Sequence, residues 1–398
     1  MSNKKLLIIS NNNLGDSLSG GDQIFLNLAK HWQKKFTITI IGSQETKNLL
    51  NKHQLSKITF FQTDSYNSKN FPSFLNLLRH TIKRTLKSIF HFFKYRHLYQ
   101  TDYIYSASDF YPDFFPAFLT KLFYPKTIWL ASFYLFAPSP FSHTSPYFQK
   151  QKLKGLFYYL SQLPVIFSIK HFSDYVFVTS TPDISKFPHK KVIVVRGGVD
   201  IAPSQKYLKS KNTIPFKKRK YDAVFIGRLH LQKGVLELID IWKLVTKKIP
   251  NAQLAIIGDG QLEIEIRQKI KKLKLSKNIH LLGFMSAPQN YKIFKDSKLV
   301  VHPATYDSGG MAAAEAMAWG LPGVSFDLPA LKTYYPQGMI KTACFDLDAF
   351  AHNIVQLLSS PSIYKTTSHE AIDLITTVWD WSKRSNKIYS EIFNHEKV

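Results

Sequence analysis

The sequence is nearly without cysteine: Cys344 is the single one among 398 residues. One thiol excludes an intramolecular disulfide framework and a zinc site built from several cysteines. A chain that needs no disulfides is typical of a reducing compartment, so we expect a cytoplasmic protein.

Long apolar runs are absent as well. Near the start only residues 6–9 form an uninterrupted apolar run, which is too short for the core of a signal peptide and predicts a first strand. Residues 127–149 carry no charge but are interrupted by prolines and serines, and residues 155–169 form a short stretch broken by Pro164. We therefore predict no transmembrane helix.

Acidic residues are scarce. The chain has 27 of them against 53 lysines and arginines, which gives a formal net charge of +26. None lies between Asp64 and Asp102 or between Asp113 and Asp174. Within residues 71–99 apolar side chains recur at helical spacing while basic side chains lie mostly on other faces, which predicts a cationic amphipathic helix.

Three interpretations of this helix stay open. It can lie on an anionic bilayer, as a peripheral contact at the inner face of the cell membrane, with aromatic rings in the interface and basic groups at phosphates. The same pattern fits an ordinary surface helix that packs its apolar stripe on a core. Nucleic acid is the third option, but no zinc finger, RNP-type aromatic motif or basic zipper is present, so no nucleic-acid partner is expected.

Short β-branched runs alternate with amphipathic helices along the whole chain, which predicts buried parallel sheets with right-handed crossovers. The length fits two domains. We predict an α/β protein with two Rossmann-like, doubly wound domains, at residues 1–200 and 221–382, facing across a ligand-binding cleft. The lysine-rich residues 201–220 lack apolar periodicity and are expected to be the linker.

Two glycine-containing loops follow predicted strands. In GRLHLQKG, Gly227 ends a strand, and Arg228 and Lys233 can converge on one anion, most naturally a phosphate, unless both are simply solvated. In SGGDQ, Gly20 and Gly21 precede a helix and allow a ligand to approach its free N–H groups. A glycine pair of this kind is more often only a turn.

The stretch YDSGGMAAAEAMAWG places two carboxylates around a third glycine turn. The pattern predicts a turn at Ser308–Gly310 and a helix over residues 311–319, closed by Gly320. Asp307 precedes the turn and Glu315 lies within the helix, so both can flank one ligand held at the helix start.

These motifs, together with AIIGDG and IHLLGF, resemble the donor half of the GT-B glycosyltransferases of the large retaining family 4, the glycosyl transferases group 1. Gly20, Gly21 and VVRGGVD resemble that family's N-terminal glycine loop and the segment before its linker. The resemblance implies a GT-B fold over nearly the whole chain, with a closing helix at about residues 383–398 that packs back on the first domain.

The resemblance also implies roles for individual residues. Arg228 and Lys233 would hold the donor diphosphate, Glu315 would bind the ribose hydroxyls, and Asp307 would face the transferred sugar. The same resemblance implies that Gly309, Gly310 and Met311 lend backbone N–H groups to the donor. The implied reaction retains the anomeric configuration and needs no metal or other cofactor, because fixed positive groups stabilise the departing diphosphate. Its implied partners are a nucleotide-sugar donor and a glycan or lipid-linked acceptor, as in polysaccharide synthesis for the cell envelope.

Two departures from the family pattern stand out. The first acidic residue is usually glutamate, whereas here it is Asp307. Many relatives carry a histidine after the strand that corresponds to TIWLASF, where this chain has Ser132, so His143 and His302 receive no role. Two alternative functions remain: a nucleotide-sugar epimerase of GT-B fold, and a nonenzymatic basic protein that binds membrane or nucleic acid and keeps a decayed donor site.

Overall fold

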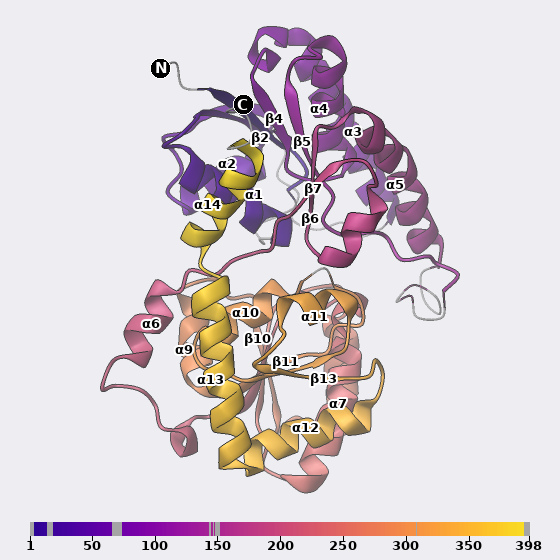
Figure 1. Ribbon diagram of the computed structural model, residues 1–398. Helices are drawn as coiled ribbons and strands as arrows, with labels where there is room; N and C mark the ends of the chain where they lie inside the picture. The colour runs from indigo at the N-terminus through magenta and orange to yellow at the C-terminus, as the bar shows by residue number, and fades with distance from the viewer. Residues whose placement is uncertain are drawn as a thin grey trace. The chain divides into compact units, whose positions relative to one another are not determined.

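The computed structural model describes residues 4–13, 19–65, 74–142, 145, 147, 152–307 and 309–393. The chain divides into two compact units (Figure 1). The N-terminal unit comprises Met1–Gly197 and Arg384–Val398, and the C-terminal unit comprises Gly198–Lys383.

The N-terminal unit contains a seven-stranded parallel sheet in the order β3-β2-β1-β4-β5-β6-β7. Its strands are short and mostly buried, as expected for a sheet covered on both faces. They are β1 (Lys5–Ser10), β2 (Thr37–Ser43), β3 (Thr59–Asp64), β4 (Tyr103–Ser106), β5 (Ile128–Ser132), β6 (Tyr175–Val178) and β7 (Lys191–Val194).

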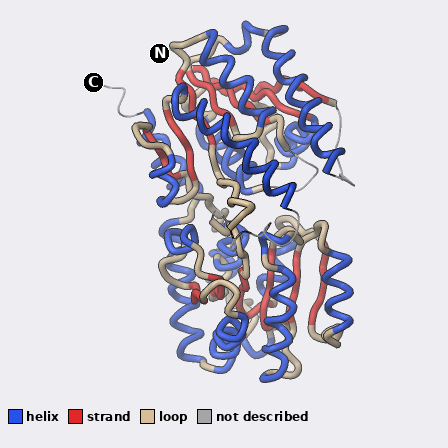
Figure 2. Tube along the Cα trace, turned by 90° about the vertical axis from the view of Figure 1, so that its right-hand side faces the viewer, coloured by secondary structure: helices blue, strands red, loops and turns tan. Residues whose placement is uncertain are grey.

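Helices cover both faces of this sheet (Figure 2). They are α1 (Gly20–Trp32), α2 (Gln44–Lys52), α3 (Phe74–Lys94), α4 (Tyr111–Phe123), α5 (Lys152–Phe172) and the returning α14 (Trp381–Phe393), with 3-10 turns η1 (Arg96–Tyr99) and η2 (Thr181–Lys186). One core joins Phe92 of α3, Phe114 of α4 and Val165 of α5 to Ile104 of β4, so these three helices pack on the same face. The ring of Tyr103, the neighbouring residue, contacts Phe393 of α14 and therefore lies on the opposite face.

The C-terminal unit contains a six-stranded parallel sheet in the order β10-β9-β8-β11-β12-β13. Its strands are β8 (Tyr221–Ile226), β9 (Leu254–Ile257), β10 (Ile279–Gly283), β11 (Ser297–His302), β12 (Gly323–Phe326) and β13 (Met339–Thr342). Its helices are α6 (Ala202–Leu208), α7 (Val235–Lys248), α8 (Glu263–Lys272), α9 (Gln289–Lys295), α10 (Met311–Met317), α11 (Pro329–Tyr334), α12 (Leu347–Ser359) and α13 (Pro361–Val378), with 3-10 turns η3 (Phe216–Lys218) and η4 (Leu231–Lys233).

In both sheets the strand order reverses next to the first strand, between β1 and β4 and between β8 and β11. This is the doubly wound arrangement, so the predicted α/β class with two Rossmann-like sheets is confirmed. Ligands of such sheets bind beyond the carboxyl ends of the strands at the reversal.

Several boundaries differ from the expected ones. Residues 201–220 do not form a linker, because they contain α6 and η3 and belong to the C-terminal unit. Along the chain, the first unit ends at Gly197 and the second begins at Gly198. Helix α10 ends at Met317, two residues before Trp319, and continues as a turn to Gly320, whose φ is +81°. Helix α3 begins at Phe74 within the described residues, whereas residues 71–73 of the expected helix lie outside them.

None of the helices that the structure describes is long and apolar enough to cross a membrane.

Candidate functional site

Two loops meet where the C-terminal sheet reverses. Strands β8 and β11 are neighbours, and the loops that follow them, residues 227–234 and 303–310, leave the same sheet edge. The N–H groups of Thr305 and Tyr306 both donate to the carbonyl oxygen of Gln232, at 3.0 and 3.2 Å. These bonds join the GRLHLQKG loop to the loop that carries Asp307.

The joined loops bring Lys233 against Asp307. The Lys233 Nζ lies 2.5 Å from Asp307 Oδ2, and His302 Nε2 lies 3.0 Å from the same oxygen. The other oxygen, Oδ1, accepts the backbone N–H groups of Gly309 and Gly310 at 3.2 and 3.1 Å. The carboxylate therefore holds two cationic or polar side chains on one oxygen and the glycine turn on the other.

Asp307 is ionised in this setting. Burial by itself would raise the pKa of Asp307, but the charge of Lys233 and the bonds from His302 and Lys233 lower that pKa well below its ordinary value. An ionised carboxylate has about four acceptor positions, and Lys233, His302, Gly309 and Gly310 all donate to this one.

Two glycines permit this close approach. Gly234 has a φ of +61°, and a Cβ there would lie 1.8 Å from the carbonyl oxygen of Pro303. Gly310 has a φ of +60°, and a Cβ there would lie 2.9 Å from His302 Nε2. The Tyr335 hydroxyl donates to the Gly310 carbonyl oxygen at 2.6 Å, which fixes the turn from the other side.

Arg228 and Glu315 flank this centre in the sequence. Arg228 is exposed, and its guanidinium makes no hydrogen bond or ion pair with the residues that the structure describes, so it is available to an anion. Glu315 lies in α10 and is only partly exposed, and burial raises the pKa of Glu315 to about 7. Near neutral pH this carboxyl group is therefore divided between its protonated and ionised forms.

The structure changes the expected roles of the glycine turn. The sequence predicts that Gly309 and Gly310 offer free N–H groups to a ligand, but both N–H groups donate to Asp307. Met311 is the first residue of α10 and is partly exposed, Gly227 donates its N–H to the Ile257 carbonyl at 3.0 Å, and Ser308 lies outside the described residues.

Gly20 and Gly21 belong to the N-terminal unit, so they are not part of this cluster. They open α1, where the Ser19 hydroxyl accepts the Asp22 N–H at 3.2 Å and the Asp22 carboxylate accepts the Ser19 N–H at 2.8 Å. A Cβ on Gly21 would lie 3.2 Å from the ring of Tyr134, so the glycine is needed for this packing as well.

His302 is the functional candidate that the sequence analysis left without a role. It ends β11, is 3% exposed and bonds Asp307, which follows five residues later. A histidine at the end of a buried strand, directly before the acidic loop, was the available signal. Ser132 is fully buried at the end of β5, and His143 lies outside the described residues.

No group of three or more histidine, cysteine, aspartate or glutamate side chains within the described ranges is placed to hold a metal ion.

The C-terminal unit is similar to a known protein family. Residues 207–373 match the family model of the glycosyl transferases group 1. This stretch is therefore similar to a group 1 glycosyltransferase domain. It contains Arg228, Lys233, Asp307 and Glu315.

Proteins similar to the chain include enzymes of polysaccharide synthesis. The chain is 27% identical over 226 residues to the amylovoran biosynthesis glycosyltransferase AmsD of Erwinia amylovora, covering 56% of this chain and 59% of that one. It is 27% identical over 159 residues to the poly(glycerol-phosphate) alpha-glucosyltransferase of Bacillus subtilis, covering 39% and 23%. An uncharacterised glycosyltransferase of Methanocaldococcus jannaschii, MJ1059, is 40% identical over 102 residues, covering 26% and 25%. The chain thus spans less than two thirds of the length of these relatives.

Solved structures match over almost the whole chain. Anabaena Alr3699/HepE, solved with UDP and glucose, has a TM-score of 0.69 at 17% identity, covering 98% of this chain and all of that one. S. aureus TarM, solved with Fondaparinux, alpha-GlcNAc-glycerol and UDP, has a TM-score of 0.71 at 14% identity, covering 97% and 99%. At such identities the likeness shows the fold alone. That fold is GT-B, with two Rossmann-like units.

Proposed function

We propose that this protein transfers a hexose from a nucleotide-diphosphate sugar to a hydroxyl group of an envelope glycan or a lipid-linked acceptor, with retention of anomeric configuration, at the cytoplasmic face of the membrane. The observation that supports this most directly is the Lys233–Asp307 pair, at 2.5 Å, held at the sheet reversal of a domain similar to the group 1 glycosyltransferases. The relatives in amylovoran and poly(glycerol-phosphate) synthesis support the class of acceptor.

The donor diphosphate would be held by Arg228 and Lys233. Arg228 is exposed, and Lys233 can turn from Asp307 toward a phosphate because its side chain is 21% exposed. In the transfer the bond between the sugar C1 and the diphosphate oxygen breaks, the acceptor oxygen bonds to C1 on the same face, and the acceptor proton passes to the departing diphosphate. The two cations stabilise the negative charge that develops on that diphosphate, so the proposal needs no metal.

Asp307 would link binding of the donor diphosphate to binding of the donor sugar. Lys233 and His302 both donate to Oδ2 while Lys233 remains paired with the carboxylate. When Lys233 moves to the diphosphate, Oδ2 would exchange that bond for one from a sugar hydroxyl. His302 and the glycine turn keep the carboxylate in place during this exchange, and Glu315 would accept the ribose hydroxyls.

The test is a binding and turnover screen of the purified chain against UDP-, GDP- and ADP-sugars by calorimetry and by release of nucleotide diphosphate. We expect one donor to bind selectively, and Arg228→Ala, Lys233→Ala and Glu315→Ala each to weaken it. Lys248→Ala is the matched control, since Lys248 is an exposed lysine of the same unit.

The outcomes separate the alternatives. Anomeric proton couplings in the product report retention, and unchanged transfer in EDTA reports metal independence. Conversion of the donor to an epimeric sugar without an acceptor would indicate an epimerase instead. Failure of every donor to bind would favour the nonenzymatic alternative.

A further inference from the structure

Helix α3 presents its apolar side to solvent. A single stripe at helical spacing is exposed, with Leu86 62%, Phe90 65% and Ile82 52% accessible. The buried side of the same helix is largely polar and includes His80, Arg84, Ser88 and His91. An ordinary surface helix has the reverse arrangement, so the interpretation that this stripe packs on the protein's own core is wrong.

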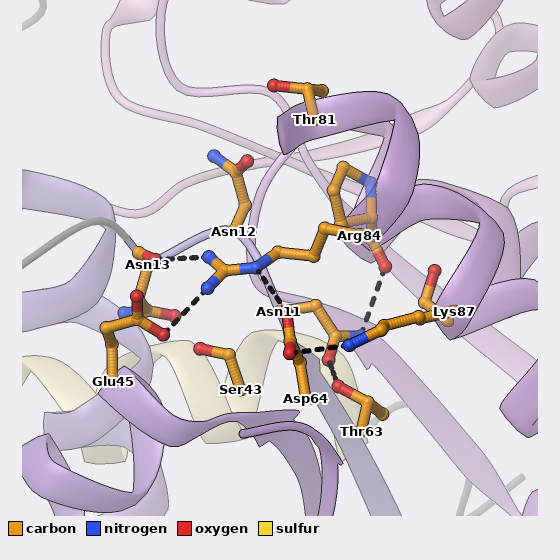
Figure 3. Close-up of polar contacts among 12 residues, drawn as sticks. Asn11, Asn12, Asn13, Ser43, Glu45, Thr63, Asp64, Thr81, Arg84 and Lys87 are labelled. Atoms are coloured by element: carbon orange, nitrogen blue, oxygen red, sulfur yellow. Dashed lines mark hydrogen bonds and ion pairs between the residues drawn. The ribbon is translucent and has the colours of Figure 1, made fainter. Parts of the chain in front are cut away.

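A buried charge cluster explains the orientation of α3 (Figure 3). The Arg84 guanidinium is 1% exposed and donates to Glu45 Oε2 at 2.7 Å and to the Asn13 carbonyl oxygen at 2.6 Å. Its Nε lies 3.6 Å from Asp64 Oδ2, and Lys87 bonds the other oxygen of Asp64 at 2.8 Å. Turning the apolar stripe inward would leave Glu45 buried without its cation, which is strongly unfavourable.

The exposed apolar surface continues beyond α3. Helix α5 covers the same face of the sheet and exposes Leu153 (81%), Leu160 (51%) and Phe167 (61%). The rings of Phe74 in α3 and Phe157 in α5 touch, with centroids 5.3 Å apart. The outward side chains of α3 and α5 are here called the helical apolar surface: Leu75, Ile82, Leu86, Phe90, Phe93, Leu153, Phe157, Leu160, Leu163 and Phe167.

The charges beside this surface have one sign. No acidic residue occurs in residues 65–101 or 114–173, which include α3 and α5 entirely. Arg79 and Lys83 are exposed next to the stripe. A shallow depression on α3 combines both chemistries and is lined by Arg79, Ile82, Lys83, Leu86, Lys87 and Phe90.

We propose that the helical apolar surface docks on an anionic lipid bilayer, with the leucine and phenylalanine side chains below the headgroups and Arg79 and Lys83 at lipid phosphates. The charge pattern selects this occupant. A second copy of the chain would bring an equally basic surface against this one, whereas an anionic leaflet complements it. The proposal concerns the N-terminal unit and does not depend on the sugar-transfer chemistry.

Flotation of the full chain with vesicles tests the proposal. We compare phosphatidylcholine alone with a phosphatidylcholine–phosphatidylglycerol mixture, at low and at raised salt. The wild type is expected to float with the mixed vesicles and to be released by salt. Phe90→Glu and Phe167→Glu should each weaken binding about tenfold or more, because each removes an aromatic ring that the bilayer would bury. Arg79→Glu with Lys83→Glu should weaken it roughly 30-fold or more.

Matched controls lie in the other unit. Ile264 is 73% exposed in α8, and Lys271 and Lys272 are exposed at the end of that helix. Ile264→Glu and the Lys271→Glu, Lys272→Glu pair should float like the wild type. Unchanged thermal transitions for all variants would show that they fold, since every altered side chain points outward.

Three results would overturn the proposal. The first is equal recovery of the wild type in solution with both kinds of vesicle. The second is concentration-dependent dimerisation, without flotation, that Phe90→Glu abolishes. The third is salt-sensitive binding of an RNA oligonucleotide, without flotation, that the Arg79→Glu, Lys83→Glu pair abolishes.

Discussion

The side chain of Asp307 is one methylene shorter than that of glutamate, and this length suits the bonds that its carboxylate makes. Its Oδ1 bonds the N–H groups two and three residues later, which is the local pattern that aspartate forms with a following turn. A glutamate would carry its carboxylate one methylene further from these N–H groups. The aspartate therefore both shapes the Gly309–Gly310 turn and pairs with Lys233.

Glu315 makes donor binding depend on pH. Burial raises the pKa of Glu315 to about 7, so its ionised fraction rises about tenfold between pH 6 and pH 8. If the carboxylate accepts the ribose hydroxyls, affinity for a nucleotide sugar should rise about tenfold over this range, as measured by calorimetry. The folded state binds the Glu315 proton more tightly than the unfolded chain, so stability should fall as the pH rises through 7.

The variant Glu315→Gln separates these two effects. It should bind the donor weakly at every pH and should be more stable than the wild type at pH 8. The same pH slope in this variant would show that another group titrates.

Arg84 should contribute strongly to the stability of the N-terminal unit. Arg84→Met leaves the fully buried Glu45 carboxylate without a cation, so we expect the free energy of unfolding to fall by about 3–5 kcal/mol in urea titrations. Lys83→Met is the control, because Lys83 is exposed on the same helix, and should change the value by less than about 0.5 kcal/mol. A similar loss in both variants would contradict the importance of the buried pair.

The sequence predicts which loops carry the candidate site residues better than it predicts the hydrogen bonds among them. Glycines next to basic and acidic residues at strand ends predicted that Arg228, Lys233 and Asp307 lie at one site, and the structure brings Lys233 and Asp307 into contact. The role of His302 could not be predicted, because its contact with Asp307 depends on how β11 ends and on how the loop turns back. That Gly309 and Gly310 bond Asp307 likewise depends on the turn geometry.

At the scale of elements, Gly234 determines how the two site loops approach each other. A Cβ at Gly234 would meet the Pro303 carbonyl oxygen at 1.8 Å, so Gly234→Ala must push the loops apart and displace Lys233. We expect donor binding to be lost, as measured by calorimetry. Gly283 provides the control: its φ of +71° is also left-handed, but a Cβ there meets nothing within 4 Å.

Gly283→Ala should therefore cost only about 1–2 kcal/mol of backbone strain and leave the donor affinity intact. If both alanine variants keep their affinity, the loop contact is not required for the site.

Periodicity predicts helices but not always the side that they bury. The spacing in residues 71–99 predicted an amphipathic helix, and within the described residues α3 spans Phe74–Lys94, followed by the turn η1. The apolar stripe would normally mark the buried side. Here the ion pairs of Arg84 with Glu45 and Lys87 with Asp64, which join residues far apart in the sequence, determine the opposite orientation. Residues 201–220 show a related limit, because the short helix α6 is too brief to give a clear period.

At the scale of the whole molecule, the last helix of the chain, α14, packs on the N-terminal unit. The Trp32 indole donates to the Ser385 carbonyl oxygen at 3.1 Å, and its ring packs against Phe393 with centroids 5.7 Å apart. Phe36 and Tyr103 contact the same phenylalanine. The first sheet therefore depends on residues that follow the entire C-terminal unit.

A chain ending at Lys383 should lose at least about 3 kcal/mol of stability, because Trp32, Phe36 and Tyr103 lose their cover. Thermal denaturation with a dye that binds exposed apolar surface measures the loss. As the control, Lys387→Ala with Glu391→Ala alters only the outer side of α14, where these side chains are 78% and 42% exposed, and should leave the transition unchanged.

The same discontinuity has a consequence during synthesis on the ribosome. The N-terminal half emerges first, but it waits for translation of residues 198–383 before α14 exists. At about 5–20 residues per second, that delay is about ten to forty seconds. Throughout it Trp32, Phe36 and Tyr103 lack their contacts with Phe393, so we expect this early stretch to expose apolar surface until α14 has been made.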